Sequence, residues 1–389
     1  MLRHLRVHVP ATLKCSLLSL ALVLVVALSI RAQAPGPDKA IALEQQGNLQ
    51  DAEHEWRLWL QKNPKDAAAC ASLGVVLSKE GKYEDAAAAY RKAIGLNPKL
   101  PGVQLNLGLA EFKLGNFQAA IAPLRAALAA DPQSMQARTL LGLSYYGAGR
   151  LEEASKHLAV ASAADPSNAE LHKVLAQSCL TARKYDCALT EFTWVVKHDP
   201  DSAEAHMLMG EALDGLKKTQ EAIAEFELAA KAAPQTPNVY FGLGFLYWKS
   251  GQFEEAARAL EMQLSLDPNN PQALAYLGDT EMKRNDAGKA LPLLSKAVQL
   301  RQDIRIAYLD LGAIYTEQKR YQDALVALRQ AEKLDPDRID VHYRLGRLFQ
   351  VMGNVAESKK EFAKVHALQK KAEDDLVGKM PGGNPPPPK

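Results

Sequence analysis

The stretch LGLSYYGAGRLEEASKHLAVASAADP, residues 141–166, contains the pattern that decides the fold. Gly142 and Ala154 lie 12 residues apart, on either side of Gly149, and Leu158 follows Ala154 by four residues. Glycine favours the tight turn that ends a helix, and a proline such as Pro166 disfavours helix in the residue before it. The stretch therefore predicts two helices joined by a tight turn, with small side chains where the helix axes approach.

The same pattern recurs every 34 residues along most of the chain. Proline marks the period at Pro64, Pro98, Pro132, Pro166, Pro200, Pro234, Pro268 and Pro336, and Gln302 fills the remaining slot. The small residue of the first helix recurs at Ala40, Gly74, Gly108, Gly142, Ala176, Gly210, Gly244, Gly278, Gly312 and Gly346. Large apolar residues recur in the second helix from Trp56 and Tyr90 to Leu328 and Phe362, and we expect them to pack between neighbouring units.

Ten such units account for nearly all of the chain after its first 34 residues. We place them at residues 33/35–66, 67–100, 101–134, 135–168, 169–202, 203–236, 237–270, 271–304, 305–338 and 339–372, so that the array spans 35–372. Pro35 and Pro37 shorten the opening helix, which we expect to begin at Asp38. The last helix is predicted to run on as a polar cap, and residues 373–389 hold its end and a proline-rich disordered tail.

These residues resemble the tetratricopeptide repeat (TPR), a 34-residue helix-turn-helix unit. The resemblance is carried by Leu141-Gly142-x-x-Tyr145-x-x-x-Gly149, followed by Ala154, Leu158, Ala161 and Pro166, and it extends over all ten units. It implies an all-α protein whose units stack into a right-handed superhelix. It also implies that the protein binds other proteins or peptides rather than catalysing a reaction.

Residues 1–34 have the three-part pattern of a secretory signal. Arg3, Arg6 and Lys14 precede an apolar run from residue 15 to residue 30, and Ala32-Gln33-Ala34 offers small residues for cleavage. Cleavage after Ala34, cleavage after Ala32 and retention as a membrane anchor remain open, with cleavage favoured. The pattern predicts an exported protein of the periplasm or cell envelope.

Net charge bears on the class of partner, and the cysteines bear on the compartment. Removing residues 1–34 leaves 43 basic and 45 acidic residues, which is no footprint for nucleic acid. An oxidising compartment would permit a disulfide between Cys179 and Cys187, and the alternative is that both are small packing residues. We expect Cys70 to be buried.

The search for chemistry finds no catalytic or metal-binding motif, and we predict no enzyme activity, no cofactor and no metal. His172, His206 and His342 occupy equivalent repeat positions, where we favour packing over metal binding because metal sites need clustered ligands. His-Glu-x-x-His, Cys-x-x-Cys and Gly-x-Ser-x-Gly patterns do not occur in the sequence.

Binding is predicted on one stripe of the first helices. With each unit numbered 1–34 and its proline at 32, we call positions 2, 5, 9 and 12 the groove positions, because in the TPR family they line the concave face. They are unusually apolar in two places, at Leu105, Leu109, Phe112, Leu143 and Tyr146, and at Phe241, Phe245 and Trp248 flanked by Met207 and Met282. Clustered apolar and aromatic residues favour an interaction site, although extra core packing is the alternative.

The groove positions also argue against one family sub-function. TPR domains that clamp an acidic C-terminus carry a Lys/Asn/Arg set there, whereas this chain has mainly Leu105, Thr139, Met207 and Phe241. The sequence therefore predicts a protein scaffold or adaptor that engages its partner through apolar groups. The alternative is a glycan-binding accessory subunit, with Trp248, Phe241 and Tyr276 stacking on sugar rings and Asp279 and Asn238 making polar contacts.

Overall fold

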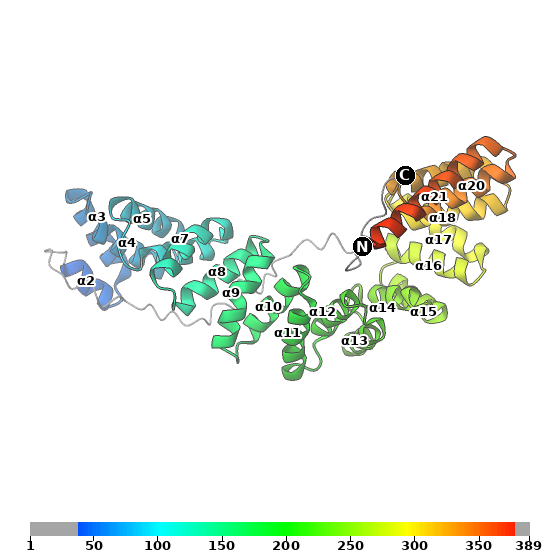
Figure 1. Cartoon of the computed structure of the whole chain (residues 1–389). Helices are drawn as coiled ribbons and strands as arrows, with labels where there is room; N and C mark the ends of the chain where they lie inside the picture. The colour runs from blue at the N-terminus through cyan, green and yellow to red at the C-terminus, as the bar shows by residue number, and fades with distance from the viewer. Residues whose placement is uncertain (1–37, 378–389) are drawn as a thin grey trace. The chain divides into compact units, whose positions relative to one another are not determined.

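The computed structural model describes residues 38–377, so the predictions for residues 1–34 and for the proline-rich tail lie outside the described residues. Within this range the structure has twenty helices and no strand. Two compact parts divide at Pro200, and we call them the N-terminal part (38–200) and the C-terminal part (201–377). Figure 1 shows that each part is a succession of helix pairs.

The helices fall into ten pairs, five in each part. In the N-terminal part they are α2 (Asp38–Gln45), α3 (Leu49–Lys62), α4 (Ala67–Lys79), α5 (Tyr83–Leu96), α6 (Val103–Lys113), α7 (Phe117–Ala130), α8 (Met135–Gly147), α9 (Leu151–Ala164), α10 (Ala169–Thr181) and α11 (Tyr185–His198). In the C-terminal part they are α12 (Ala203–Gly215), α13 (Thr219–Ala232), α14 (Val239–Lys249), α15 (Phe253–Leu266), α16 (Pro271–Lys283), α17 (Ala287–Leu300), α18 (Arg305–Glu317), α19 (Tyr321–Leu334), α20 (Ile339–Val351) and α21 (Val355–Val377).

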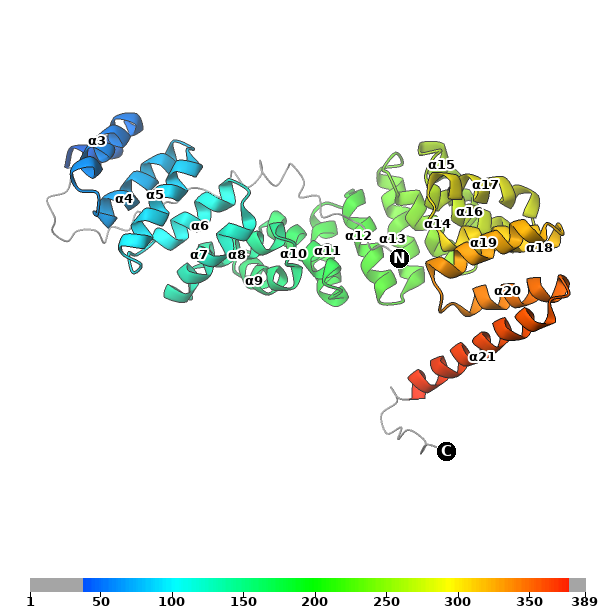
Figure 2. The same ribbon diagram turned by 90° about the horizontal axis from the view of Figure 1, so that it is seen from above.

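Both ends of the described array agree with the sequence analysis. Helix α2 begins at Asp38, after the two prolines, and α21 continues past its partner α20. Figure 2 shows this continuation beyond the last pair. After α2, two more first helices start late in their units, because Pro101-Gly102 and Pro237-Asn238 precede α6 and α14 and both Gly102 and Asn238 have positive φ.

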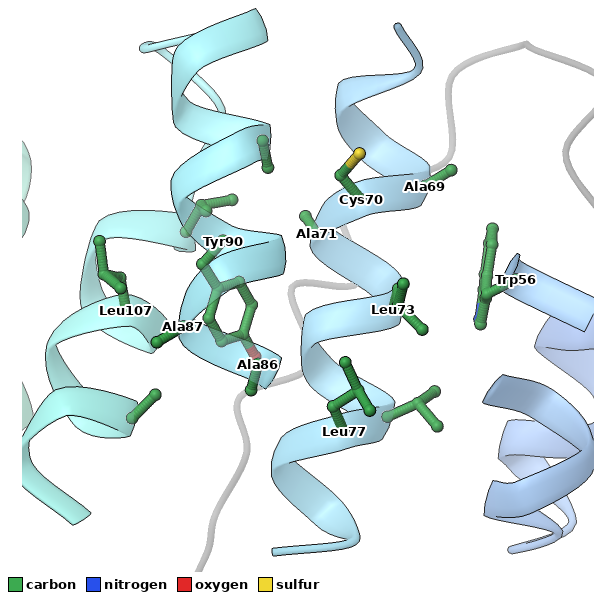
Figure 3. Close-up of a cluster of buried hydrophobic side chains, with 14 of the residues drawn as sticks. Trp56, Ala69, Cys70, Ala71, Leu73, Leu77, Ala86, Ala87, Tyr90 and Leu107 are labelled. Atoms are coloured by element: carbon green, nitrogen blue, oxygen red, sulfur yellow. The ribbon is translucent and has the colours of Figure 1, made fainter. Parts of the chain in front are cut away.

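In eight of the ten pairs a large side chain of the second helix lies over the glycine of the first helix, and alanine replaces that glycine in the other two. A Cβ added at Gly74 would come within 2.5 Å of the Tyr90 ring, and one at Gly278 within 2.6 Å of Leu294. Figure 3 shows Tyr90 on one side of α4 and Trp56 of the preceding pair on the other. The large residues thus pack within a unit as well as between units, as Phe226 does against Gly210 of its own unit and Gly242 of the next.

The turn inside each pair contains one residue in the left-handed backbone conformation, even where that residue is not glycine. Gly149 has a φ of 73°, and the equivalent residue in four other units is Arg183, Lys217, Asn285 or Lys319, with φ between 58° and 64°. The repeat geometry therefore imposes this backbone conformation on residues whose Cβ disfavours it. Among the described helices, none has both the length and the apolar content that crossing a membrane requires.

Replacing one of these strained residues by glycine should stabilise the array. Lys319 is exposed and has a φ of 62°, so Lys319→Gly removes a Cβ conflict without removing a packed side chain. We expect the free energy of unfolding to rise by about 0.5–1 kcal/mol, because the gain is partly offset by the greater freedom of the unfolded chain. Thermal denaturation of Lys319→Gly beside Lys319→Ala, which keeps the Cβ, measures the effect; equal melting temperatures for both variants would contradict it.

Candidate functional site

Helix α14 has apolar residues on more than one face. Val239, Leu243 and Leu246 are buried against the rest of the C-terminal part. Phe241, Phe245 and Trp248 are spaced as i, i+4 and i+7, so they share a second face, and all three are partly exposed. We call these three side chains the α14 surface. One apolar face is enough to pack a helix into the array, so the second apolar face of α14 is the candidate binding site.

The rings of the α14 surface surround Tyr276 on α16. Ring centroids lie 6.0 Å from Tyr276 for Phe241, 5.3 Å for Phe245 and 5.0 Å for Trp248, all in edge-to-face geometry. Phe245 also stacks on Trp248 with centroids 5.9 Å apart. The aromatic cluster is therefore continuous across two units. The three rings pack partly on the core residue Tyr276, so the alternative of extra core packing is correct in part.

Below the rings lies a buried polar chain. Trp248 donates its indole Nε1–H to Asp279 Oδ2 at 2.5 Å, and Asp279 is 4% exposed. Asp310 on α18 faces Asp279, and its Oδ2 has no hydrogen-bond partner among the described residues. Burial and the neighbouring Asp279 carboxylate raise the pKa of Asp310 well above its usual value, because both disfavour a second negative charge. Arg344 Nη2 approaches Asp310 Oδ1 only to 4.0 Å.

A side chain of α15, the second helix of the same pair, forms a hydrogen bond with the first turn of α14. Because α14 starts late, Phe241 lies in its first turn, where backbone N–H groups have no intrahelical acceptor. The Phe241 N–H instead donates to the side-chain Oε1 of Gln263 at 3.2 Å, and Gln263 is only 2% exposed. Gln263 was not singled out in the sequence. A polar residue at an otherwise apolar position of the second helix is the signal that could have found it.

The two flanking methionines differ in their surroundings. Met282 is partly buried against the core cluster that contains Tyr276 and that the three rings also contact. Met207 packs instead against a smaller cluster of Ala203, Ala229 and Val239. The structure thus brings Met282 together with the rings and gives Met207 a separate environment.

The predicted site in the N-terminal part needs correction. Phe112, Leu143 and Tyr146 are 8%, 2% and 4% exposed, so their side chains belong to the interior rather than to a binding surface. The reason is close packing of successive first helices, since the Tyr146 hydroxyl on α8 bonds to Gln177 on α10 at 2.6 Å. Leu105 and Leu109 are partly exposed. Two leucines remain where the sequence suggested a five-residue patch.

The three equivalent histidines each bind a glutamate 19 residues later. Nδ1 to Oε2 distances are 2.5 Å for His172–Glu191, 2.7 Å for His206–Glu225 and 2.7 Å for His342–Glu361. In two of the pairs Nε2 also contacts the carbonyl of the preceding repeat proline, Pro166 or Pro336. Each histidine thus links the two helices of its pair, and His172 and His342 also bind the loop before them, which is a structural role.

Glu332 joins the last of these pairs in a cluster whose ligand atoms are close enough to hold a cation. Arg329 and Lys364 already occupy it, however. Arg329 contacts Glu361 at 3.2 Å, and Lys364 contacts Glu332 at 3.1 Å and Glu361 at 3.2 Å. Two fixed positive charges beside the carboxylates oppose a metal ion there.

Cys179 on α10 and Cys187 on α11 form a disulfide in the structure, with Cα atoms 5.8 Å apart across the turn. The spacing lies within the range that a disulfide requires. Cys70 is buried and free, as expected. The disulfide joins the two helices of one unit and leaves a single free thiol among the described residues.

The buried carboxyl pair should lower stability as the pH rises. Because the folded pKa of Asp310 exceeds its unfolded pKa, the folded state keeps a proton that the unfolded state loses above about pH 4. Asp310→Asn supplies an amide donor to Asp279 and removes the repulsion. We expect it to raise the free energy of unfolding at pH 7 by about 1 kcal/mol and to flatten the pH dependence.

Chemical denaturation at pH 5 and pH 7.5 tests this, with the exposed Glu317→Gln on the same helix as a control. A variant Asp310→Asn that is destabilised equally at both pH values would show that the carboxyl pair carries no excess energy.

Comparisons with known proteins agree with this architecture. Family models described as tetratricopeptide repeat match residues 111–178, 173–237 and 247–313, and one described as TPR repeat matches 74–115 and 312–353, so together they cover more than half of the chain. Comparison with curated proteins found no match.

Similar solved structures include YrrB, a TPR protein with an unusual peptide-binding site, at 21% identity over 48% of this chain and 97% of that chain, with a TM-score of 0.39. The anaphase-promoting complex assembly Cut9–Hcn1 is 16% identical over 85% of this chain and 80% of that chain, with a TM-score of 0.49. A TPR protein from Parabacteroides merdae is 18% identical over 64% and 97%, with a TM-score of 0.47. With ten helix pairs, the glycine contacts inside them and family models matched along most of the array, the chain belongs to the tetratricopeptide repeat family.

Proposed function

We propose that this protein is a non-enzymatic scaffold that binds a segment of a partner protein along the groove positions of its C-terminal part. The TPR fold supports protein–protein interaction as the general role. The observation that carries the specific site is the α14 surface, where three aromatic side chains remain partly exposed on one helix face. Such connected aromatic patches are the usual energetic centres of protein interfaces.

The glycan alternative has less support. Of the groups assigned to sugar contact, Tyr276 and Asp279 are each 4% exposed, and Asp279 already accepts the Trp248 indole N–H. Asn238 lies before α14 rather than on it. Sugar sites need several free hydrogen-bonding groups next to a ring, and the α14 surface offers mainly apolar atoms.

We further propose that the protein works outside the cytoplasm, in the periplasm or cell envelope, either released or anchored by residues 15–30. The apolar leader supports export. The Cys179–Cys187 disulfide supports an oxidising compartment. Nucleic acid is not expected as a partner, because the chain without its leader is nearly neutral.

Truncating the central ring should weaken partner binding. Trp248→Ala removes the side chain that contacts both Phe245 and Tyr276, and we expect a loss of about 2 kcal/mol or more, roughly 30-fold in affinity. Partners crosslinked to the protein in its native envelope are identified, purified and titrated against both forms. Met262→Ala is the matched control, because Met262 is a large exposed apolar residue on the second helix of the same unit. Unchanged affinity of a folded Trp248→Ala protein would refute the site.

The thiol count of the native protein tests the compartment. Denatured without reductant, the protein isolated from its host should expose one reactive thiol, Cys70, and after reduction three. Retention of the leader adds Cys15 to both counts. Three thiols before reduction, with the leader absent by mass, would mean that the disulfide does not form in the cell.

A further inference from the structure

The groove positions of the C-terminal part are acidic as well as aromatic. Their charged members are Glu204, Glu211, Asp214, Asp279, Asp340 and Arg347, five acids against one base. At position 9 the row reads Glu211 on α12, Phe245 on α14 and Asp279 on α16. The Glu211 and Asp279 carboxyl groups therefore hold, in the two neighbouring units, the repeat position that Phe245 holds on α14.

Several of these acids already have a cationic partner. Lys249 binds Asp214 at 2.5 Å, and Arg305 and Arg338 bind Asp340 at 3.1 and 3.3 Å. The two acids that flank Phe245 differ from them. Asp279 accepts from the Trp248 indole and faces the Asp310 carboxyl group, whose Oδ2 is buried without a partner.

The cations near the Asp279–Asp310 pair are too distant or too exposed to neutralise its charge fully. Arg344 approaches Asp310 to 4.0 Å, and the other cation close enough to act on Asp310 is Lys283, whose side chain is exposed. Glu211, at position 9 of the preceding unit, makes no hydrogen bond or ion pair with the described residues, and it is partly buried.

The aromatic rings favour the same kind of ligand as the acids. Ring faces carry partial negative charge and attract ammonium and guanidinium groups, most strongly when the site is desolvated. Trp248 has committed its N–H to Asp279, so its ring face is what it can present to a partner. An acidic partner would be repelled by the Glu211 carboxylate, and a neutral partner would leave that carboxylate without a counter-charge.

We propose that the α14 surface, together with Glu211 at the equivalent position of the preceding unit, binds a lysine or arginine side chain from an otherwise apolar segment of a partner protein. This inference rests on the proposed function and adds the chemistry of the partner. It is opposite in charge to the clamp for acidic C-termini that the sequence excludes. The cationic group would lie over the Phe245 and Trp248 rings, and neighbouring apolar side chains would contact Phe241 and Met282.

The titration of Glu211 makes the inference measurable. Burial raises the pKa of Glu211 to about 7, with no charged group contributing to the shift. A bound cation favours the ionised carboxylate, so affinity should rise with pH between 6 and 8. On its own helix and on the packed helix α13, His206 binds Glu225, Asp214 binds Lys249, Glu221 binds Lys218 and Glu227 binds Tyr247. The remaining charged groups of these two helices, Glu204 and Lys231, do not contribute to the pKa shift of Glu211.

The test begins with an unbiased choice of ligand. Random 12-residue peptides displayed on phage are selected on the full chain, and those that also bind Trp248→Ala are removed. Trp248-dependent peptides should be enriched in lysine and arginine relative to the starting library. Absence of that enrichment, or enrichment in aspartate and glutamate, overturns the cationic ligand while leaving the proposed binding site intact. Failure to obtain any Trp248-dependent peptide overturns both.

Affinities of the selected histidine-free peptides then locate the charge. Fluorescence anisotropy at pH 6 and pH 8 should show binding about fivefold to tenfold tighter at pH 8. Glu211→Gln, which preserves shape, should weaken binding at pH 8 by a similar factor and remove the pH dependence, whereas Met262→Ala should behave as the wild type. Equal binding by Glu211→Gln and wild-type protein at pH 8 contradicts the inference.

Discussion

The contact on which the rest of the structure depends is made by a large side chain of the second helix lying over a small residue of the first helix, which is glycine in eight pairs and alanine in two. A side chain at Gly312 would meet Leu328 at 2.5 Å, and one at Gly244 would meet Leu260 at 2.6 Å. The small and the large residue both recur every 34 residues. The two helices of a pair therefore approach most closely at the same point in each unit, and each helix keeps the same rotation about its axis. That rotation decides which residues of a first helix are buried and which reach the groove positions.

The groove of the C-terminal part combines this rigid frame with groups that cost stability. Asp279 and Asp310 are two carboxyl groups placed together in the interior, and one oxygen has no partner. Glu211 is partly desolvated without a counter-ion. An array built only for stability would hold apolar residues at these places, as Ala313 does at position 9 of the next unit. Local departures of this kind are expected where a surface is shaped for a ligand.

Much of the fold could be predicted because the residues that determine it recur every 34 positions in the sequence. The ten helix pairs, the start at Asp38 and the burial of Cys70 follow from spacing and from residue size. The α14 surface could be predicted because its three aromatics stand out from a regular background. The left-handed turn at Arg183, Lys217, Asn285 and Lys319 could not be read from residue type alone, because the repeat geometry overrides local preference there.

What the sequence could not provide were contacts between residues far apart in the chain. The burial of Tyr146 depends on how closely α10 covers α8, and periodicity does not contain that distance. The bond from Phe241 N to Gln263 depends on the late start of α14. The glutamate partners of the three histidines do have a signal, since Glu191, Glu225 and Glu361 each follow their histidine by 19 residues. The other units lack the histidine, and of these units the first alone has a glutamate, Glu55, at the second position.

The central claim is that the α14 surface contacts a partner protein in the cell. Site-specific photocrosslinking tests it most directly, with a benzophenone side chain in place of Phe245 and, in a separate strain, in place of the exposed Met262 on α15 of the same unit. The account predicts a discrete crosslinked protein from position 245 and none from position 262. Crosslinks of equal yield and identity from both positions, or from position 262 alone, would contradict it.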